Sequence, residues 1–411
     1  MARLTMWRGS SCILSLLVVM CVGASAARSA PEESLAAANG TCRSRVEPFG
    51  YGCEEHTVTT QDGYILSLQR ITSDRSGESA TGGGGKVPVL LQHGLMMDGM
   101  TWLMNSPNES LGYILADNGY DVWIANTRGT VYSLGHTSLS SSDPAYWNWS
   151  WDELASNDLS AMLQYAYDHS SQQKVHYVGH SLGTLIALAA LSDQQQHVSM
   201  LRSAGLLSPI AFLNKVSSPL ALAAADVFLA EALYWLGIDE FDPTGTAVHG
   251  LLTDICKLPG VNCYDLMSSF TGDNCCLDNS SVQTFLAHEP QASSTKNMVH
   301  LAQMIRRGII AKYDYGDASD NIKYYGQATP PVYNVSAIPD DFPLFLSSGG
   351  KDSLSDVQDV RRLEQALKSH DSDTLTVQYL ADYAHADFVL AGNAKERVYG
   401  PLMAFFRLQD K

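Results

Sequence analysis

The amino-acid sequence predicts an α/β fold with a mostly parallel central sheet and an inserted helical cap. Short apolar runs typical of buried parallel strands alternate with segments of helical spacing up to residue 207, and this alternation returns after residue 331. Residues 208–330 between them are apolar and helical in character. We therefore expect a core formed by residues 27–207 and 331–411, with residues 208–330 as a cap or lid over the sheet.

The N-terminal residues read as a secretory signal peptide spanning residues 1–26. Arg3 and Arg8 form a basic region, "CILSLLVVMCVG" is an apolar stretch, and Ala24-Ser25-Ala26 fits a cleavage site. The apolar stretch is too short to span a bilayer comfortably. We expect a soluble mature protein that is extracellular or lies in the lumen of an acidic compartment such as a vacuole or lysosome.

The charge of the chain argues against nucleic acid and anionic membranes as partners. The formal net charge is −17, and removal of the two arginines with the leader takes it to −19. Such a protein repels phosphate groups, so contact with lipid has to be driven by apolar surface. The sequence indicates no obligate protein partner.

Cysteines and glycosylation sequons agree with an oxidising compartment. Six cysteines remain after the leader, and we expect them to form disulfides: Cys42, Cys53, Cys256, Cys263, Cys275 and Cys276. Cys42 with Cys53 is one plausible bridge, while the other four cysteines allow three connectivities. No cysteine pairs with histidine at a zinc spacing, so no metal site is expected. The candidate N-glycosylation sites are Asn39, Asn108, Asn148, Asn279 and Asn334.

The elements of the core follow from their patterns in chain order. "EHTVTTQDGYILSLQRI" alternates apolar and polar residues around Asp62-Gly63, which predicts a hairpin with a two-residue turn. "VPVLLQ" and "YDVWIAN" predict buried strands, with the helix "SLGYILADNG" between them. "WDELASNDLSAMLQYAYDH" has helical spacing and leads into the strand "KVHYV". "DFPLFLSSGGKD" and "TLTVQYLADYAHADF" restore the pattern near the C-terminus.

Gly179-His180-Ser181-Leu182-Gly183 follows the strand "KVHYV" and precedes the helix "TLIALAALS". A serine between two glycines in a strand-turn-helix context is typical of a nucleophile elbow. The glycines remove Cβ atoms that would clash in so tight a turn, and the serine hydroxyl stands at a helix N-terminus. Ser181 is therefore the candidate nucleophile of an α/β-hydrolase.

A serine hydroxyl needs a base and an orienting acid, which follow it in chain order in this fold. Asp352 follows a predicted strand and a Gly-Gly turn, and His385 lies on a loop after the next strand. Asp356 is a competitor for the acid, but it reads as an exposed acid at a helix start. His93 and His180 are interpreted as packing and hydrogen-bonding groups. We predict Ser181, Asp352 and His385 as the catalytic set.

The tetrahedral intermediate also needs hydrogen-bond donors for its oxyanion. We expect the backbone N–H groups of Leu182, directly after the nucleophile, and of Leu95, on the loop after "VPVLLQ". The predicted mechanism passes through an acyl-enzyme on the serine and requires no cofactor.

The sequence resembles the acid lipase family, which includes gastric lipase, lysosomal acid lipase and plant relatives. The resemblance rests on "EEHTVTTQDGYILSLQRI", "LLQHGL", "LADNGYDVWIANTRG", "HYVGHSLG", "PPVYNVSAI", "GGKDSLSDVQDV" and "HADF". Leucine follows the nucleophile where the mammalian lipases carry glutamine, which is similar to the plant branch. The resemblance implies the same catalytic set and oxyanion donors, a movable lid, and acyl glycerols or sterol esters as substrates. It places Cys256 and Cys263 near the family's cap disulfide.

We predict a secreted lipase that hydrolyses carboxylic esters of neutral lipids, triacylglycerols in particular, at an oil–water or membrane interface. The apolar stretch "LALAAADVFLAEALYWLG" of the cap suits such an interface. The alternatives are a sterol-ester hydrolase or general carboxylesterase with the same catalytic set. A catalytically silent lipid-binding protein of this fold is a remote third reading, because all three catalytic residues are present.

Overall fold

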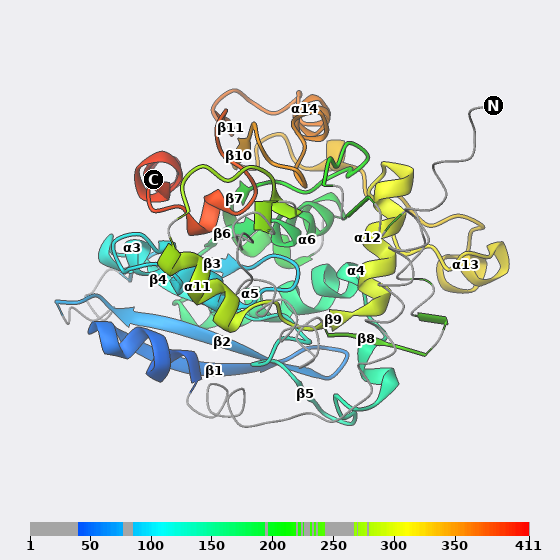
Figure 1. Cartoon of the computed structure of the whole chain (residues 1–411), viewed down its shortest axis with the longest axis horizontal. Coiled ribbons are helices and arrows are strands. Elements are labelled where there is room, and N and C mark those ends of the chain that lie inside the picture. Colours follow the sequence, from blue (N-terminus) through cyan, green and yellow to red (C-terminus); the bar gives the residue numbers. More distant parts are fainter. Residues whose placement is uncertain are drawn as a thin grey trace, which may run out of the picture.

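The structure is a computed structural model of the whole chain (Figure 1). It describes residues 40–76, 85–193, 196–218, 267–268, 270–277 and 279–410, together with residues 237–242 and a few single residues between 221 and 235. The predicted signal peptide, Asn39, Cys256 and Cys263 lie outside the described residues, as does most of the apolar stretch 220–237. Every described helix is too short or too polar to cross a bilayer.

A mostly parallel sheet forms the centre of the described chain. The strands are β1 (Gly52–Thr59), β2 (Tyr64–Ser73), β3 (Pro88–Gln92), β4 (Asp121–Ala125), β5 (Gly135–His136), β6 (Val175–His180), β7 (Leu201–Leu207), β10 (Leu344–Gly349) and β11 (Leu375–Leu380). Their order is β1-β2-β4-β3-β6-β7-β10-β11, with β5 beside β2. All neighbours from β4 to β11 pair in parallel. The loops that follow these strands therefore meet at one edge, which is where ligands bind in open α/β sheets.

Helices cover both faces of this sheet (Figure 1). They are α3 (Leu111–Asp117), α4 (Trp151–Glu153), α5 (Leu159–His169), α6 (Leu182–Ser192), α14 (Val357–Ala366), α15 (Asp387–Leu390) and α16 (Gly400–Gln409). Successive residues of β4 point to opposite faces: Trp123 packs in a core with α5 and α6, while Val122 and Ile124 pack in a second core with α3 and α16. A strand buried on both faces has to be apolar throughout, which explains the continuous runs in the sequence.

The N-terminal hairpin differs from its predicted form in the turn. The N–H of Thr60 donates to the carbonyl oxygen of Tyr64 at 2.8 Å, so residues 61–63 form the connection and the predicted two-residue turn was wrong. Gly63 has φ +96° there. A three-residue connection with glycine in the left-handed region is the next common hairpin type, and Asp62-Gly63 alone does not distinguish the two.

The segment between β7 and β10 leaves and re-enters the sheet at adjacent strands, since Leu344 pairs with Ala204. Its longer described helices are α11 (Asn279–His288), α12 (Thr295–Arg307) and α13 (Ala318–Tyr325), and a small antiparallel sheet joins β8 (Glu240–Phe241) to β9 (Ser293–Ser294). These helices agree with the helical character expected of residues 208–330. The boundaries of the cap remain a prediction.

Two disulfides occur in the described residues. Cys42 is bonded to Cys53, which joins the first helical turn to β1. Cys275 is bonded to its neighbour Cys276. This second pairing was one of several that the sequence left open. Asn108, Asn148 and Asn334, three of the candidate glycosylation residues, are exposed.

Candidate active site

Ser181 lies in a strained turn between β6 and α6. Its φ is 55° and its ψ is −121°, in a region that residues with a side chain rarely adopt. The N–H of Ser181 donates to the carbonyl oxygen of Leu207 in the neighbouring strand at 3.1 Å, which holds the turn against the sheet. The residue is 9% exposed. This is the geometry of a nucleophile elbow.

The glycines around Ser181 are required by close backbone contacts. A Cβ on Gly179 would lie 2.7 Å from the carbonyl carbon and oxygen of Gly183. A Cβ on Gly183 would lie 2.7 Å from the carbonyl oxygen of Gln92, at the end of β3. A Cβ on Gly94 would lie 2.9 Å from the Cβ of Ser181. The absence of side chains therefore lets β6, α6 and the loop after β3 converge on the serine.

Asp352 and His385 follow β10 and β11 and are hydrogen-bonded to each other. Nδ1 of His385 lies 2.9 and 3.0 Å from the two carboxylate oxygens of Asp352. Both residues are buried. Oδ1 of Asp352 also accepts the N–H groups of Leu354 and Ser355, at 2.9 and 2.8 Å. The two residues that the sequence separates by 33 positions are thus one unit in space.

The ionisation of this pair follows from its surroundings. Burial acts to raise the pKa of Asp352, but His385 and the hydrogen bonds from His385, Ser355 and Leu354 outweigh burial, and the pKa is lowered. An ionised carboxylate only accepts hydrogen bonds, so Nδ1 of His385 is the donor. Nε2 of His385 then remains available to accept a proton.

The two other histidines at this edge are neutral. Burial is the largest cause and the nearby His385 the next, and they lower the pKa of His180 to about 3. Nε2 of His180 bonds the backbone oxygen of His385 at 3.0 Å, so the residue before Ser181 contacts the histidine loop. Burial lowers the pKa of His93 to about 4, and its Nε2 accepts the N–H of Thr127 at 3.1 Å. These contacts agree with their interpretation as packing and hydrogen-bonding groups.

The loop after β3 brings Leu95 beside the serine. Within the described residues, neither the N–H of Leu95 nor that of Leu182 has a protein hydrogen-bond partner. A small pocket is lined by both leucines, with Met97, Leu154 and Asn297 among its other lining residues. One amide directly follows Ser181 and the other follows Gly94, which approaches Ser181, so both are available as the oxyanion donors that we predict.

Asp356 does not take part in this cluster. Its side chain caps α14 by accepting the N–H of Gln358 at 2.8 Å. The sequence interpretation of Asp356 as a helix-start acid is therefore the one that the structure supports.

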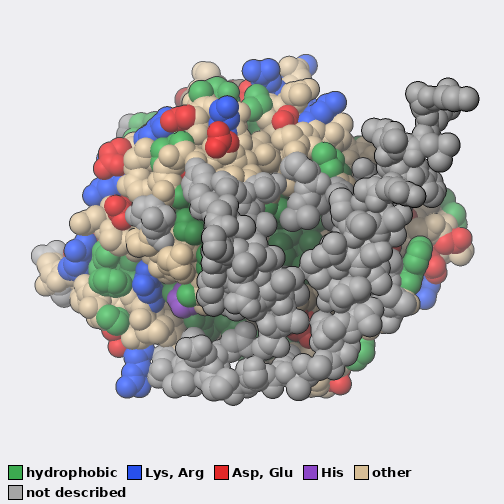
Figure 2. Space-filling view, viewed as in Figure 1, with side chains coloured by type: hydrophobic (Ala, Val, Ile, Leu, Met, Phe, Trp, Pro, Cys, Tyr) green, Lys and Arg blue, Asp and Glu red, His purple; other side chains and the backbone are tan. Residues whose placement is uncertain are grey.

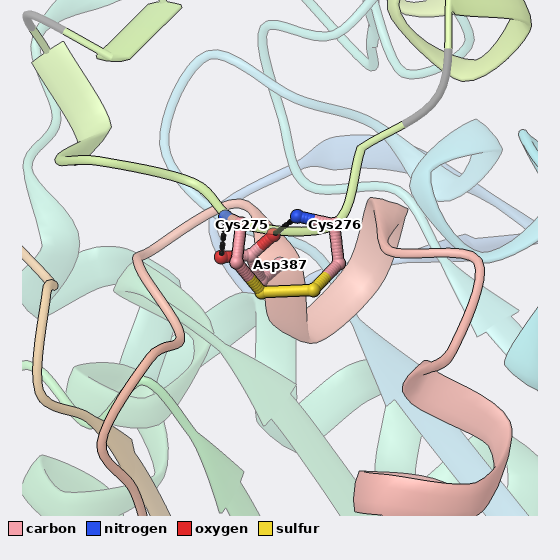
Figure 3. A group of neighbouring side chains, drawn as sticks. All are labelled: Cys275, Cys276 and Asp387. Atoms are coloured by element: carbon pink, nitrogen blue, oxygen red, sulfur yellow. Dashed lines mark hydrogen bonds between the residues drawn. A yellow bond between two sulfur atoms is a disulfide. The ribbon is translucent and has the colours of Figure 1, made fainter.

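Sequence reasoning missed Asp387, which lies two residues after His385. Asp387 is fully buried, and its carboxylate accepts the N–H groups of Ala384, Cys275 and Cys276 at 2.8, 3.1 and 3.2 Å (Figure 3). Its place in "HADF" beside the candidate histidine was the available signal. The sulfurs and a carboxylate oxygen of this group lie within 4.8 Å of one another, but the sulfurs are joined as a disulfide.

Comparison with known proteins identifies the family of the chain. The model of the alpha/beta hydrolase fold matches residues 87–391, and that of the partial alpha/beta-hydrolase lipase region matches residues 42–106. The chain is 52% identical to triacylglycerol lipase 2 of Arabidopsis thaliana over 91% of its own length and 89% of the relative's. It is 34% identical to gastric triacylglycerol lipase of Rattus norvegicus, over 89% and 91%.

Solved structures agree on the fold. A soluble variant of monoglyceride lipase from Saccharomyces cerevisiae superposes with a TM-score of 0.52 at 16% identity, over 86% of this chain and 95% of that one. At such low identity the likeness concerns the architecture alone. The family models and the relatives carry the assignment further: the chain belongs to the acid lipase family of the α/β-hydrolases and is a carboxylic ester hydrolase.

Proposed function

We propose that this lipase is secreted and hydrolyses triacylglycerols through an acyl-enzyme on Ser181. The observation that carries the proposal is the contact between the two parts of the site: His180, next to Ser181 in the elbow, bonds the backbone of His385, which is hydrogen-bonded to Asp352. The names of the relatives, triacylglycerol lipase and gastric triacylglycerol lipase, support the substrate class. The signal-peptide pattern of residues 1–26 and the sequons support secretion.

The proposed reaction has two halves that use the same groups. Oγ of Ser181 attacks the ester carbonyl carbon while Nε2 of His385 takes the hydroxyl proton, and Asp352 stabilises the imidazolium. The carbonyl oxygen becomes an oxyanion that the N–H groups of Leu95 and Leu182 stabilise, each worth about 3 kcal/mol of the barrier. The alcohol leaves with the proton from His385. Water, activated by His385, then releases the fatty acid from Ser181.

Ser181→Ala tests the proposed catalytic role. The variant should fold and be secreted, because alanine removes only the hydroxyl, while ester turnover should fall at least about a thousandfold. Titration of released fatty acid from a triacylglycerol emulsion measures this loss. Ser142→Ala, at an exposed serine outside the site, is the control. Parental turnover in the purified Ser181→Ala protein would exclude this mechanism.

The substrate class is tested separately from the mechanism. A lipase should gain rate when its ester passes from dissolved to emulsified, whereas a general carboxylesterase should not. Comparison of a series of glycerol esters of increasing chain length with cholesteryl esters, each as an emulsion, distinguishes a triacylglycerol lipase from a sterol-ester hydrolase. Preference for cholesteryl esters would leave the catalytic set intact and correct the substrate.

A further inference from the structure

Residues 270–277, here called the brace, bond to both loops that carry the candidate acid and base. The brace belongs to the long segment between β7 and β10. Gly272 forms a β-bridge with Asp352, and Leu277 forms one with Ala391. The carbonyl oxygen of Thr271 accepts the N–H of His385 at 3.1 Å and that of Ser353 at 3.2 Å. One short segment thus contacts the backbone of Asp352 and of His385.

The brace also packs closely against these loops. A Cβ on Gly272, whose φ is +102°, would lie 2.0 Å from the carbonyl oxygen of Lys351. Oδ1 of Asn274 accepts the N–H of Ala386 at 3.2 Å, and the carbonyl oxygen of Cys276 accepts that of Gly392 at 3.2 Å. The position of the histidine loop therefore depends on the backbone path of residues 271–276.

Asp387 and the disulfide join the brace to the histidine loop at one point (Figure 3). The Asp387 carboxylate accepts the N–H of Ala384 in the histidine loop. It also accepts the N–H groups of Cys275 and Cys276 in the brace. Figure 3 shows the disulfide beside this carboxylate, with both cysteine N–H groups pointing towards it. A bond between neighbouring side chains closes a small covalent ring that includes their shared peptide group. The ring therefore restricts the N–H of Cys276, which Asp387 accepts, and it fixes Cα of Cys275, next to the second N–H that Asp387 accepts.

The disulfide is open to reagents from solution, since Cys275 is exposed and Cys276 half-buried. Exposed disulfides are the ones that thiols reduce readily. A dithiol reductant would break the Sγ–Sγ bond, leave a thiol on each cysteine and become a cyclic disulfide itself. The two neighbouring thiols could then condense with a trivalent organoarsenical, an arsonous acid, with loss of two water molecules. That reaction requires paired thiols, and comparison with a variant that lacks both cysteines shows which part of it belongs to Cys275 and Cys276.

We propose that the Cys275–Cys276 disulfide and Asp387 form a redox-sensitive positioning unit for His385, so that reduction by a dithiol lowers turnover. The inference rests on the proposed catalytic role of His385 and Ser181. Once the ring opens, the peptide between the cysteines can rotate and take the N–H of Cys276 away from Asp387, so the histidine loop loses one of its two hydrogen bonds to the brace at that carboxylate. Misplacement of a catalytic group by about 1 Å can cost up to about a hundredfold in rate.

The test compares the wild type with Cys275→Ser/Cys276→Ser, before and after treatment with a dithiol. For the wild type we expect kcat on a soluble ester to fall about tenfold or more on reduction, with KM nearly unchanged, and to return on reoxidation. The double variant should already have the low kcat and should not respond further. Labelling of Ser181 by a fluorophosphonate should slow in parallel, because that reaction uses the same base. The arsenical should hold the reduced wild type in its slow state.

The outcomes separate this inference from the proposed function. The other cysteines are reduced in both proteins, so an equal response of wild type and double variant would assign the effect to them and overturn the inference. Full activity of the wild type after mass spectrometry shows Cys275 and Cys276 as thiols would also overturn it. In both cases Ser181→Ala remains the test of catalysis. Asp387→Asn should lower kcat without changing KM, whereas loss of structure would lower the melting temperature instead.

Discussion

At the scale of single residues, the site depends on glycines, which lack side chains, as much as on the candidate catalytic side chains. Ser181 accepts a positive φ because Gly179, Gly183 and Gly94 have no side chains to oppose the approach of three backbone segments. His385 and Asp352 in turn depend on backbone N–H groups that fix the carboxylate. Side chains perform the proposed chemistry, whereas main-chain contacts hold those side chains in position.

Gly183→Ala tests this dependence on a missing side chain. The new Cβ would lie 2.7 Å from the carbonyl oxygen of Gln92 and 2.9 Å from that of His93, both of them backbone atoms. Either α6 or the loop with Leu95 has to shift, so we expect kcat to fall by about a hundredfold with a smaller loss of stability. Enzyme kinetics and thermal unfolding measure the two effects. Gly392→Ala, whose Cβ would meet only Glu109 at 3.7 Å, should be near neutral. Comparable losses in both variants would contradict this explanation.

At the scale of elements, two buried carboxyl groups join the loop after β3 to the end of α11. Oε1 of Glu289 accepts the N–H of Asp98 at 3.2 Å, and the N–H of Gln291 donates to the carbonyl oxygen of Met96 at 2.8 Å. Burial raises the pKa of Asp98 to about 7 and raises that of Glu289 well above its ordinary value. The hydrogen bond between the two carboxyl groups lowers the pKa of Asp98 and raises that of Glu289, so Glu289 is the member that keeps its proton. The contact that supports Leu95 thus contains a titratable proton.

This contact should make the protein less stable as pH rises. Carboxyl pKa values above those of the unfolded chain mean that the folded state binds more protons, so stability decreases from about pH 4 to above pH 7. In Glu289→Gln an amide replaces the protonated carboxyl, and the decrease between about pH 5 and pH 8 should be smaller by on the order of 1–3 kcal/mol. Denaturant unfolding at the two pH values measures it. Glu396→Gln, at an exposed position, is the matched control. Identical pH profiles for wild type and Glu289→Gln would disprove the role of the pair.

At the scale of the whole molecule, charge decides which lipid surfaces the protein approaches. The net charge is −17 and the isoelectric point is about 5.0. Lysine and arginine side chains lie among aspartate and glutamate along the upper and left edges of the face in Figure 2. An anionic surface should therefore repel the protein over about one Debye length, roughly 10 Å at 0.1 M salt. Apolar contact has to provide the attraction.

We expect phosphatidylserine, added as a minor component of a triacylglycerol emulsion, to slow hydrolysis at low salt. Added sodium chloride should restore the rate by screening the repulsion. Emulsions with the same fraction of phosphatidylcholine control for dilution of the substrate. Initial rates of fatty-acid release at several salt concentrations measure the effect. A faster rate on the anionic surface at low salt would point to a local basic docking site instead.

The sequence predicted the architecture and the three candidate side chains because both follow from local patterns. Continuous apolar runs such as the strand at Pro88–Gln92 indicate burial on both faces, and the elbow around Ser181 has a fixed spacing. What it did not predict depends on contacts distant in the chain. Nothing near Glu289 indicates that it meets Asp98, and Cys275 beside Cys276 left several pairings open. The hairpin turn was wrong because Asp62-Gly63 fits two connection lengths.

The adjacency of β7 and β10 has a consequence for how such enzymes can be recombined. Because the chain departs and returns at neighbouring strands, an exchange of everything between Leu207 and Leu344 for the matching piece of a relative would leave the sheet's hydrogen-bonding ladder unbroken. Such a chimera would carry the segment that we expect to determine substrate specificity from another enzyme, on an unchanged sheet. The donor piece would need residues equivalent to Thr271 and Gly272. Without a brace that bonds to the acid and base loops, the chimera would fold but turn over slowly.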